Sequence, residues 1–397
     1  MKKILIITPR FPFPVIGGDR LRIYKLCEAL YKSGKYELTL LSLCETKAEL
    51  TYDVDERIFN KIYRIYLPKY QSYIQALGGI CTSQPLQIFY YRSRKLSKKL
   101  EELLPHFDAT LSHLIRVGDY LKDNDTCVNF LEMTDSISMN YRRVRDVNEY
   151  IGIRGLIYKL EQKRLEKYER AIVEKFALVS FVSDIDVNYL FNNTKHNIRV
   201  YANGVDTHAL PFMKRRIKKN ELIEFVFIGN MLSLQNIDAV KWFIFNVLVK
   251  LNVDKAIYRL KIVGKIKDSD RRYFNSISNV SATGAVESIS EQVKSGHIGI
   301  CPIRLGAGLQ NKILEYMSLG LPCISSSIGF EGIGAIENQH ILVADNYEEY
   351  VTSLNNLFDD HFYDFLAYNA REFVHKNYSW DFRLSCFVND VDNILGV

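Results

Sequence analysis

The sequence predicts an α/β protein of two domains, each built on a parallel, doubly wound sheet. Three observations lead to this class. The chain has 397 residues, which is more than a single hydrophobic core usually holds. Short apolar runs alternate with amphipathic helical stretches along most of the chain, as they do in doubly wound sheets. A basic segment at 214–221 interrupts this alternation, which then starts again.

The first half opens with the apolar run 3–8, which we expect to form a buried strand. A loop rich in Pro and Gly follows it. Apolar residues then recur at helical spacing over 21–34, where Gly34 is a natural end. Further strands are expected at 38–44, 63–68, 107–114, 127–135, 178–183 and 198–206, and helices at 92–104 and 154–176.

The second half repeats the pattern after the basic segment 214–221, which we interpret as an interdomain linker or a surface loop. This interpretation places the seam between the domains near 205–222. Strands are expected at 223–229, 258–264, 280–286, 298–303, 322–327 and 340–344, and helices at 237–251, 312–320, 348–360 and in the tail after Trp380.

Composition limits the classes of function. No run approaches the roughly 20 apolar residues of a membrane helix, and the first apolar run is too short for a signal peptide. Seven scattered cysteines without a Cys-x-x-Cys pair favour a reducing compartment, so we expect a cytoplasmic protein.

Charge is spread unevenly along the chain. Residues 1–200 carry 32 Lys and Arg against 24 Asp and Glu, whereas residues 201–397 carry 20 against 22. A basic first half suits an anionic membrane surface, a lipid diphosphate or a nucleic acid, although a solvated basic surface explains it equally well. Nucleic acid is disfavoured because the aromatic residues form no basic–aromatic platform.

The loop after the first strand is one candidate site. It contains Gly17 and Gly18, which let backbone amides approach a phosphate, and the N-terminus of the following helix favours negative charge. The spacing is not G-x-G-x-x-G, so a nicotinamide or flavin site is poorly supported. A simple turn is the alternative reading.

The segment 302–317 is the stronger candidate. Gly306 and Gly308 form a turn after a strand, and the helix that follows carries Lys312 and Glu315. Amides, cation and carboxylate thus occur in the order that a nucleotide diphosphate needs, because the carboxylate can accept hydrogen bonds from ribose hydroxyls. Alternatively, Lys312 and Glu315 form an ordinary surface pair one helical turn apart.

Together these motifs resemble the family 4 glycosyltransferases of GT-B fold, many of which build bacterial surface polysaccharides. The most specific matching piece is GAGLQNKILEYMSLGLPCISSSIGFEGI at 306–333. Other matching pieces, in the family's order, are Asn203-Gly204-Val205-Asp206, 227–243, 262–265, 283–292 and 378–380.

The resemblance implies two Rossmann-like domains that face each other across a cleft. They would comprise 1–205 with a C-terminal crossover helix at 380–397, and 206–379. The implied reaction is sugar transfer with retention, from a nucleotide-diphosphate sugar to a lipid-linked or polysaccharide acceptor. A UDP-sugar is favoured over a GDP-sugar.

The resemblance also assigns roles in donor binding. Glu315 would bind the ribose, and Lys312 and Arg304 the diphosphate. The backbone of Val286 would read the base, and His113 would contact the donor sugar. The remaining donor contacts would come from the turns, at Gly17, Gly18, Gly306, Gly308 and Leu309.

Three positions depart from the family pattern. Ala307 stands where the family has its first glutamate, and Asn230 and Gln235 stand where basic residues are usual. Asp135 and Arg20 are expected on the acceptor side, although Asp135 could instead cap the next helix.

We expect no cofactor and no metal. Asp184-Ile185-Asp186 has the spacing of a metal motif, but capping of a helix start explains it. Two alternatives stay open, a nucleotide-sugar 2-epimerase of the same fold and a non-catalytic sugar-binding or scaffold subunit.

One interpretation of the basic first half is a peripheral contact with the anionic inner face of the plasma membrane. The basic region 141–170 contains an apolar stretch at 151–160 that resembles an interfacial helix. The alternative is a helix that packs on its own domain.

Overall fold

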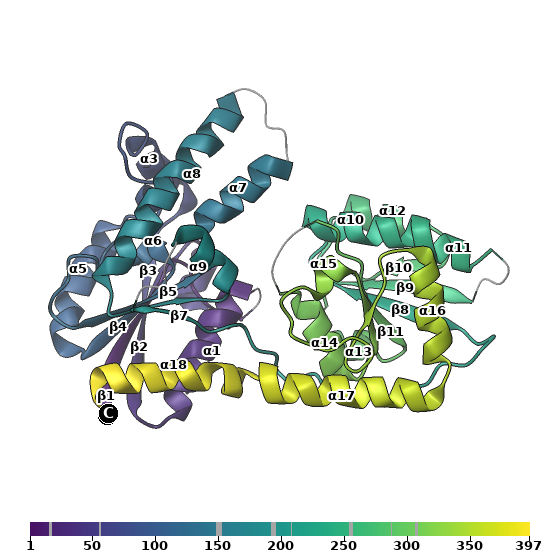
Figure 1. Ribbon diagram of the computed structural model, residues 1–397. Coiled ribbons are helices and arrows are strands. Elements are labelled where there is room, and N and C mark those ends of the chain that lie inside the picture. Colours follow the sequence, from purple (N-terminus) through teal and green to yellow (C-terminus); the bar gives the residue numbers. More distant parts are fainter. Residues whose placement is uncertain are drawn as a thin grey trace. The chain divides into compact units, whose positions relative to one another are not determined.

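The computed structural model divides the chain into two compact units (Figure 1). The first consists of Met1–Asn203 and Arg383–Val397, and the second of Gly204–Phe382. The structure describes residues 1–15, 18–54, 57–147, 153–191, 196–207, 209–253, 257–286, 288–305 and 309–397; the side chains of 143–147 and 153–158 are also outside the description.

The described part of the first unit contains a seven-stranded parallel sheet in the order β3-β2-β1-β4-β5-β6-β7. Its central strands are runs of branched apolar residues that are buried on both faces, as in a doubly wound sheet. The strands are β1 (Lys2–Thr8), β2 (Tyr36–Cys44), β3 (Lys61–Tyr66), β4 (Ala109–His113), β5 (Val128–Thr134), β6 (Leu178–Phe181) and β7 (Ile198–Val200).

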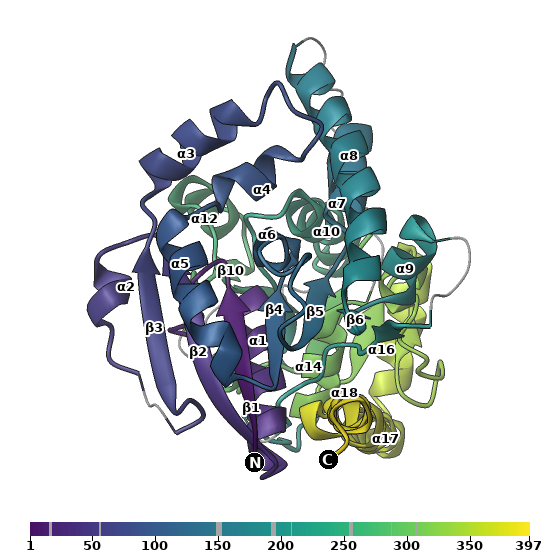
Figure 2. The ribbon, with the colours of Figure 1, turned by 90° about the vertical axis from the view of Figure 1, so that its left-hand side faces the viewer.

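Helices surround this sheet, and Figure 2 shows α3 and α4 beyond the carboxyl ends of the strands. Serine side chains cap two of these helices: Ser93 accepts a hydrogen bond from the Leu96 amide at the start of α5, and Ser183 accepts one from the Ile185 amide at the start of α9. The helices are α1 (Gly18–Lys32), α2 (Ala48–Thr51), α3 (Lys69–Gly78), α4 (Leu86–Tyr90), α5 (Arg94–Leu103), α6 (Ile115–Gly118), α7 (Ile137–Val147), α8 (Ile153–Ile172) and α9 (Asp184–Leu190), with the 3₁₀ turns Leu104–His106 and Val173–Lys175.

The second unit has a six-stranded parallel sheet in its described part, in the order β10-β9-β8-β11-β12-β13. Its strands are β8 (Ile223–Ile228), β9 (Tyr258–Val263), β10 (Val280–Ala282), β11 (Ile298–Cys301), β12 (Cys323–Ser325) and β13 (Leu342–Val343). Its helices are α10 (Leu234–Phe243), α11 (Val249–Leu251), α12 (Asp268–Asn275), α13 (Ile289–Gln292), α14 (Asn311–Leu319), α15 (Ser327–Phe330), α16 (Tyr347–Leu357) and α17 (Asp360–Tyr378), and a π-helical turn spans Ile244–Leu248.

The last helix, α18 (Trp380–Leu395), returns the chain to the first unit. Leu384, Phe387 and Val391 are buried along it. Asp392 receives hydrogen bonds from the hydroxyl of Tyr36 and, at 2.6 Å, from the Nζ of Lys35. The first unit is therefore completed by residues from the far end of the chain.

The predicted fold class is confirmed, because both units are α/β with parallel sheets. Of the two interpretations of 214–221, the interdomain linker is wrong and the surface loop is confirmed, because the segment lies inside the second unit and most of its residues are exposed. Arg215 is buried inside the second unit, where it donates to the carbonyls of Met213, Leu319 and Val293 at 2.6–3.3 Å. A single arginine that satisfies several carbonyls holds this basic segment against the body of the unit.

The hydrophobicity of the helices shows whether any of them could span a membrane. Across the described ranges, no helix combines the length and the apolar character needed to cross a bilayer.

Candidate functional site

The carboxyl edge of the second sheet is shaped by a close approach of two turns. Gly229 follows β8 and Gly264 follows β9. Gly264 has φ +142°, and a Cβ there would lie 2.1 Å from the carbonyl oxygen of Gly229. Only glycine permits this packing, which brings the loops after the two strands together.

Lys312 lies at the start of α14, on the helix that follows β11. Its side chain is buried, and its Nζ donates to Oδ1 of Asn236 at 2.9 Å and to Oε1 of Gln310 at 3.2 Å. The ring of Phe227 lies 4.9 Å from the same nitrogen. Burial lowers the pKa of Lys312. Within the described ranges, the partners of this ammonium group are amide oxygens, and no carboxylate forms a salt bridge with it. Its positive charge is therefore available to an anionic ligand.

Glu315 lies one helical turn further along α14. It is only partly exposed, and burial raises the pKa of its carboxyl to about 7, while the charge of Lys312 acts in the opposite direction. Among the described residues no salt bridge joins Glu315 to Lys312, so the simple surface-pair reading does not describe this helix. A carboxylate with raised pKa beside a buried cation is typical of a functional site.

The other residues that were predicted to bind the nucleotide sugar differ in their surroundings. Arg304 is already paired, with Nε and Nη2 lying 3.2 and 2.8 Å from the carboxylate of Asp238 on α10. Val286 and Leu309 pack, partly buried, against the core of the second unit. Gly306 and Gly308 lie outside the described residues.

Asn236 is a candidate that the sequence reasoning missed. It lies in the first turn of α10, where its Oδ1 accepts from Lys312 and its Nδ2 donates to the carbonyl of Asn230 at 2.9 Å. The family pattern predicts basic residues near Asn230 and Gln235 and assigns nothing to Asn236. The available signal was an amide side chain at a helix start that follows a buried strand, a position suited to anion binding.

His113 ends β4 in the first unit and is buried, with 3% of its surface exposed. Among the residues that the structure describes, neither ring nitrogen has a hydrogen-bond partner. Burial lowers its pKa to about 4, with the Glu132 carboxylate acting in the opposite direction. The imidazole is therefore neutral at physiological pH, and its two unsatisfied nitrogens need an explanation, which a bound hydroxyl would supply.

The structure brings His113 together with Arg20, since both line one small cavity beside α1. Arg20 lies 3.5 Å from the carboxylate of Glu49 and donates to the carbonyl of Pro14 at 3.3 Å. Gly18 is the first residue of α1, with open space where a Cβ would stand. Gly17 lies outside the described residues.

Asp135 follows β5 and accepts a hydrogen bond from the side chain of Asn140 at 2.8 Å. The cap of α7 is the neighbouring Ser136, whose Oγ accepts from the Met139 amide at 3.2 Å. Ser136 therefore occupies the capping position of α7.

A buried ion pair beside His113 also escaped the sequence reasoning. Arg22 on α1 and Glu132 on β5 are fully buried, with Nε and Nη2 at 3.3 and 3.4 Å from the two carboxylate oxygens. Ser180 and the backbone amide of Thr134 also donate to Glu132. The sequence signal, a glutamate inside an apolar strand, was visible, but its partner 110 residues away was not.

Over the ranges that the structure describes, no three His, Cys, Asp or Glu side chains are grouped so that they could hold a metal ion. Asp186 accepts instead from the amide of Ser136 at 2.8 Å, and Ser183 caps α9. The expectation of a metal-independent reaction stays a prediction.

Comparison with known proteins gives the class of the second unit. Residues 223–360 match the family described as glycosyl transferases group 1. An uncharacterized 44.6 kDa protein in the cps region of Klebsiella pneumoniae is 23% identical over 95% of this chain and 97% of its own length.

Solved structures share the whole fold. Sucrose-phosphate synthase from Thermosynechococcus elongatus superposes with a TM-score of 0.72, at 12% identity over 100% of both chains. The Anabaena protein HepE, in complex with UDP and glucose, gives a TM-score of 0.66 at 11% identity, over 99% of this chain and 100% of its own. The fold is thus that of the GT-B glycosyltransferases, and the match to group 1 glycosyl transferases covers residues 223–360 within the second unit.

Proposed function

We propose that this protein transfers a sugar, with retention at the anomeric carbon, from a UDP-sugar to a lipid-linked or polysaccharide acceptor in surface-glycan synthesis. The observation that carries the proposal is Lys312, a buried cation held by two amide oxygens, with Glu315 one turn away. The Klebsiella relative in a cps region and the UDP in the Anabaena structure support the choice of pathway and donor.

Each residue has a defined task in this reaction. Lys312 stabilises the negative charge that develops on the departing nucleotide diphosphate. Glu315 accepts hydrogen bonds from the ribose hydroxyls. His113, as a neutral imidazole, has one nitrogen that donates and one that accepts, and it can therefore orient a sugar hydroxyl. Asp135 and Arg20 are assigned to the acceptor.

Nucleotide binding is tested by thermal unfolding of the wild type and Glu315→Ala with UDP, GDP, CMP, NAD or coenzyme A. A ligand that binds only the folded state raises stability by RT ln(1 + [L]/Kd), about 2.7 kcal/mol at 100 times Kd. We expect a rise with UDP that Glu315→Ala loses. Glu337→Ala is the matched control, because Glu337 is an exposed glutamate of the same unit. No response to any nucleotide would contradict the proposal.

Transfer itself is tested by UDP release from UDP-sugars with and without acceptor, before and after treatment with EDTA. We expect release that depends on the acceptor and is unchanged by chelation, because Lys312 and backbone amides supply the positive charge. Conversion of the donor without acceptor would indicate a 2-epimerase instead.

A further inference from the structure

Helix α3 in the first unit has its apolar face on the outside. Tyr70, Tyr73, Ile74 and Leu77 recur at helical spacing and are 63–69% exposed, and Ile80 just beyond the helix is 52% exposed. The one described residue that α3 buries is Ser72. A surface helix normally buries its apolar stripe and exposes its polar side, so α3 is inverted.

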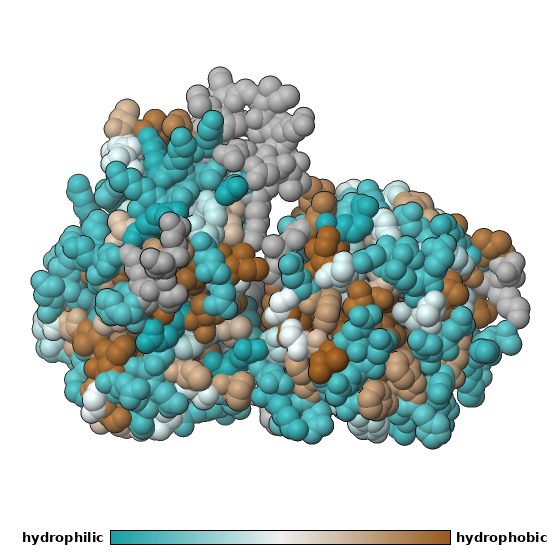
Figure 3. All heavy atoms as spheres, viewed as in Figure 1, coloured by the Kyte–Doolittle hydropathy of each residue, from teal (hydrophilic) through white to brown (hydrophobic). Residues whose placement is uncertain are grey.

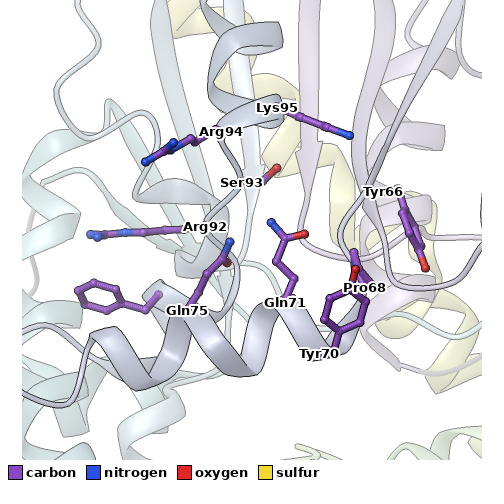
Figure 4. A pocket seen from close by; sticks show the side chains of 10 residues that line it. Tyr66, Pro68, Tyr70, Gln71, Gln75, Arg92, Ser93, Arg94 and Lys95 are labelled. Atoms are coloured by element: carbon purple, nitrogen blue, oxygen red, sulfur yellow. The ribbon is translucent and has the colours of Figure 1, made fainter.

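A pocket of about 780 Å³ lies beside α3, between it and the start of α5. Figure 4 shows Gln71 and Gln75 rising from α3 toward Ser93, with Arg92 and Arg94 extended on one side. Arg92 stacks 4.0 Å over the ring of Phe89 and donates to Gln84. Arg94 and Lys95 also line the pocket, and among the described residues neither makes a salt bridge.

The surrounding sequence is basic without interruption. From 57 to 100 the chain contains no Asp or Glu. The same stretch contains nine basic residues, Arg57, Lys61, Arg64, Lys69, Arg92, Arg94, Lys95, Lys98 and Lys99. Figure 3 shows hydrophobic side chains at the surface where Figure 1 places α3. Exposed apolar and tyrosine side chains on a basic background are the pattern of a helix that lies in a membrane interface.

We propose that the apolar face of α3, together with the Arg92–Arg94–Lys95 pocket, docks on the surface of an anionic phospholipid bilayer. The apolar side chains enter the boundary between headgroups and acyl chains, and the pocket receives lipid phosphates. Charge complementarity selects this occupant. Lys69, Arg92 and Lys99 are paired with Glu45, Asp119 and Glu102, whereas Arg94 and Lys95 have no salt-bridging carboxylate among the described residues, so the pocket beside α3 keeps a positive charge that favours a negative surface. The inference rests on the proposed function only for its purpose, which is to bring the enzyme to a lipid-linked acceptor.

Vesicle flotation tests the proposal directly. The wild type should float with phosphatidylglycerol vesicles, float poorly with phosphatidylcholine vesicles, and be released by high salt. Ile74→Ser/Leu77→Ser should weaken binding roughly tenfold or more, since two large apolar side chains no longer leave water. Arg94→Gln/Lys95→Gln should remove the preference for anionic lipid.

Two matched controls carry the same chemical changes on the second unit. Phe245→Ser/Val249→Ser alters two apolar residues that are 52% and 51% exposed. Lys294→Gln/Lys376→Gln alters two lysines whose side chains are 59% and 67% exposed. Both controls should float like the wild type, and equal losses in a control and its test variant would overturn the assignment to α3.

Other outcomes separate this inference from the proposed function. Failure of the wild type to bind anionic vesicles would contradict the proposed docking surface, even if UDP still stabilises the protein. A lipid-free dimer that Ile74→Ser/Leu77→Ser dissociates, measured by light scattering, would overturn it in favour of contact between copies. Vesicle binding without any response to nucleotides would support the surface and refute only the transferase.

Discussion

At the scale of single residues, the pKa values of Lys312 and Glu315 are shifted by the same cause. Burial disfavours both charges, so it lowers the pKa of the lysine and raises that of the glutamate to about 7. Without a ligand, neither charge has an ionic partner among the described residues. A diphosphate would stabilise the ammonium, and ribose hydroxyls would stabilise the carboxylate, so the same ligand resolves both.

Glu315→Gln is expected to stabilise the ligand-free protein at high pH. A carboxyl whose folded pKa is raised to about 7 binds its proton more tightly when folded, so its contribution is complete below its ordinary pKa of 4.5 and is lost as pH rises through 7. The variant does not lose stability in this way. Its free energy of unfolding should exceed that of the wild type by about 1–2 kcal/mol at about pH 8 and by little at about pH 4.5.

Urea unfolding at the two pH values measures this effect. The comparison must be the difference between variant and wild type, because burial also raises the pKa of Glu169 to about 7. A gain that is equal at both pH values would contradict the assigned titration.

His113→Leu is expected to separate stability from activity. The wild type loses stability as pH falls from the ordinary histidine pKa of 6.5 toward about 4, because only the unfolded state takes up the proton readily. Leucine leaves no unsatisfied nitrogen and should be neutral or stabilising by about 1 kcal/mol, more so at about pH 5.

Transfer by this variant should nevertheless fall by about 100-fold, because the sugar hydroxyl loses its partner. Acceptor-dependent UDP release measures the activity and thermal unfolding measures the stability. Full activity in a stable His113→Leu variant would remove His113 from the site.

At the scale of elements, a buried ion pair fixes helix α1 on the first sheet. Arg22 extends from α1 to Glu132 on β5 and also donates to the carbonyl of Ala202 at 3.5 Å. Glu132 is the register partner of His113 in the neighbouring strand. The same contact therefore positions the start of α1, with Gly18 and Arg20, near the end of β4.

Arg22→Met should destabilise the protein by about 3–5 kcal/mol, because it leaves a buried carboxylate without its cation. Arg22→Met/Glu132→Leu should be less destabilised than the single variant, since no charge remains buried. Urea denaturation of these two variants and of Glu132→Leu gives the coupling free energy. A double variant that is no more stable than Arg22→Met would show that the pair acts through packing alone.

At the scale of the whole molecule, the first unit depends on the last residues of the chain. Leu384, Phe387 and Val391 are buried in it, and Tyr201 donates to Asp390 at 2.5 Å. The second unit ends at Phe382, so the final helix stabilises a unit other than the one that precedes it.

Deletion of 383–397 should therefore destabilise the first unit selectively. Each of the three apolar side chains contributes about 1.5–3 kcal/mol through burial. Limited proteolysis should cleave 1–203 faster while the second unit stays protected, and UDP should still raise the melting temperature of the second unit. Deletion of Gly396 and Val397 alone is the control, because both are exposed. Equal loss of protection in both units would contradict this division.

Much of the fold could be predicted from local patterns. The runs 3–8 and 223–229 became β1 and β8 because branched apolar residues without intervening polar positions suit a strand that is buried on both faces. Helix α3 was not predicted, since its apolar residues meet water and its buried side offers only Ser72. The sequence left the segment 214–221 open between a linker and a surface loop, because its charges gave no sign of the buried contacts that hold Arg215 on the second unit.

The sequence by itself determined the two parallel α/β units and the order of glycine turn, Lys312 and Glu315, because these depend on residues close together in the chain. The tertiary structure alone decided that Asn236 holds Lys312, that Arg22 contacts Glu132, and that His113 is buried without a hydrogen-bond partner among the described residues. These facts depend on contacts between distant strands and helices, and on the burial that shifts each pKa. The spacing of apolar residues determines which segments form strands and helices. The contacts between residues far apart in the chain determine the chemistry of the site.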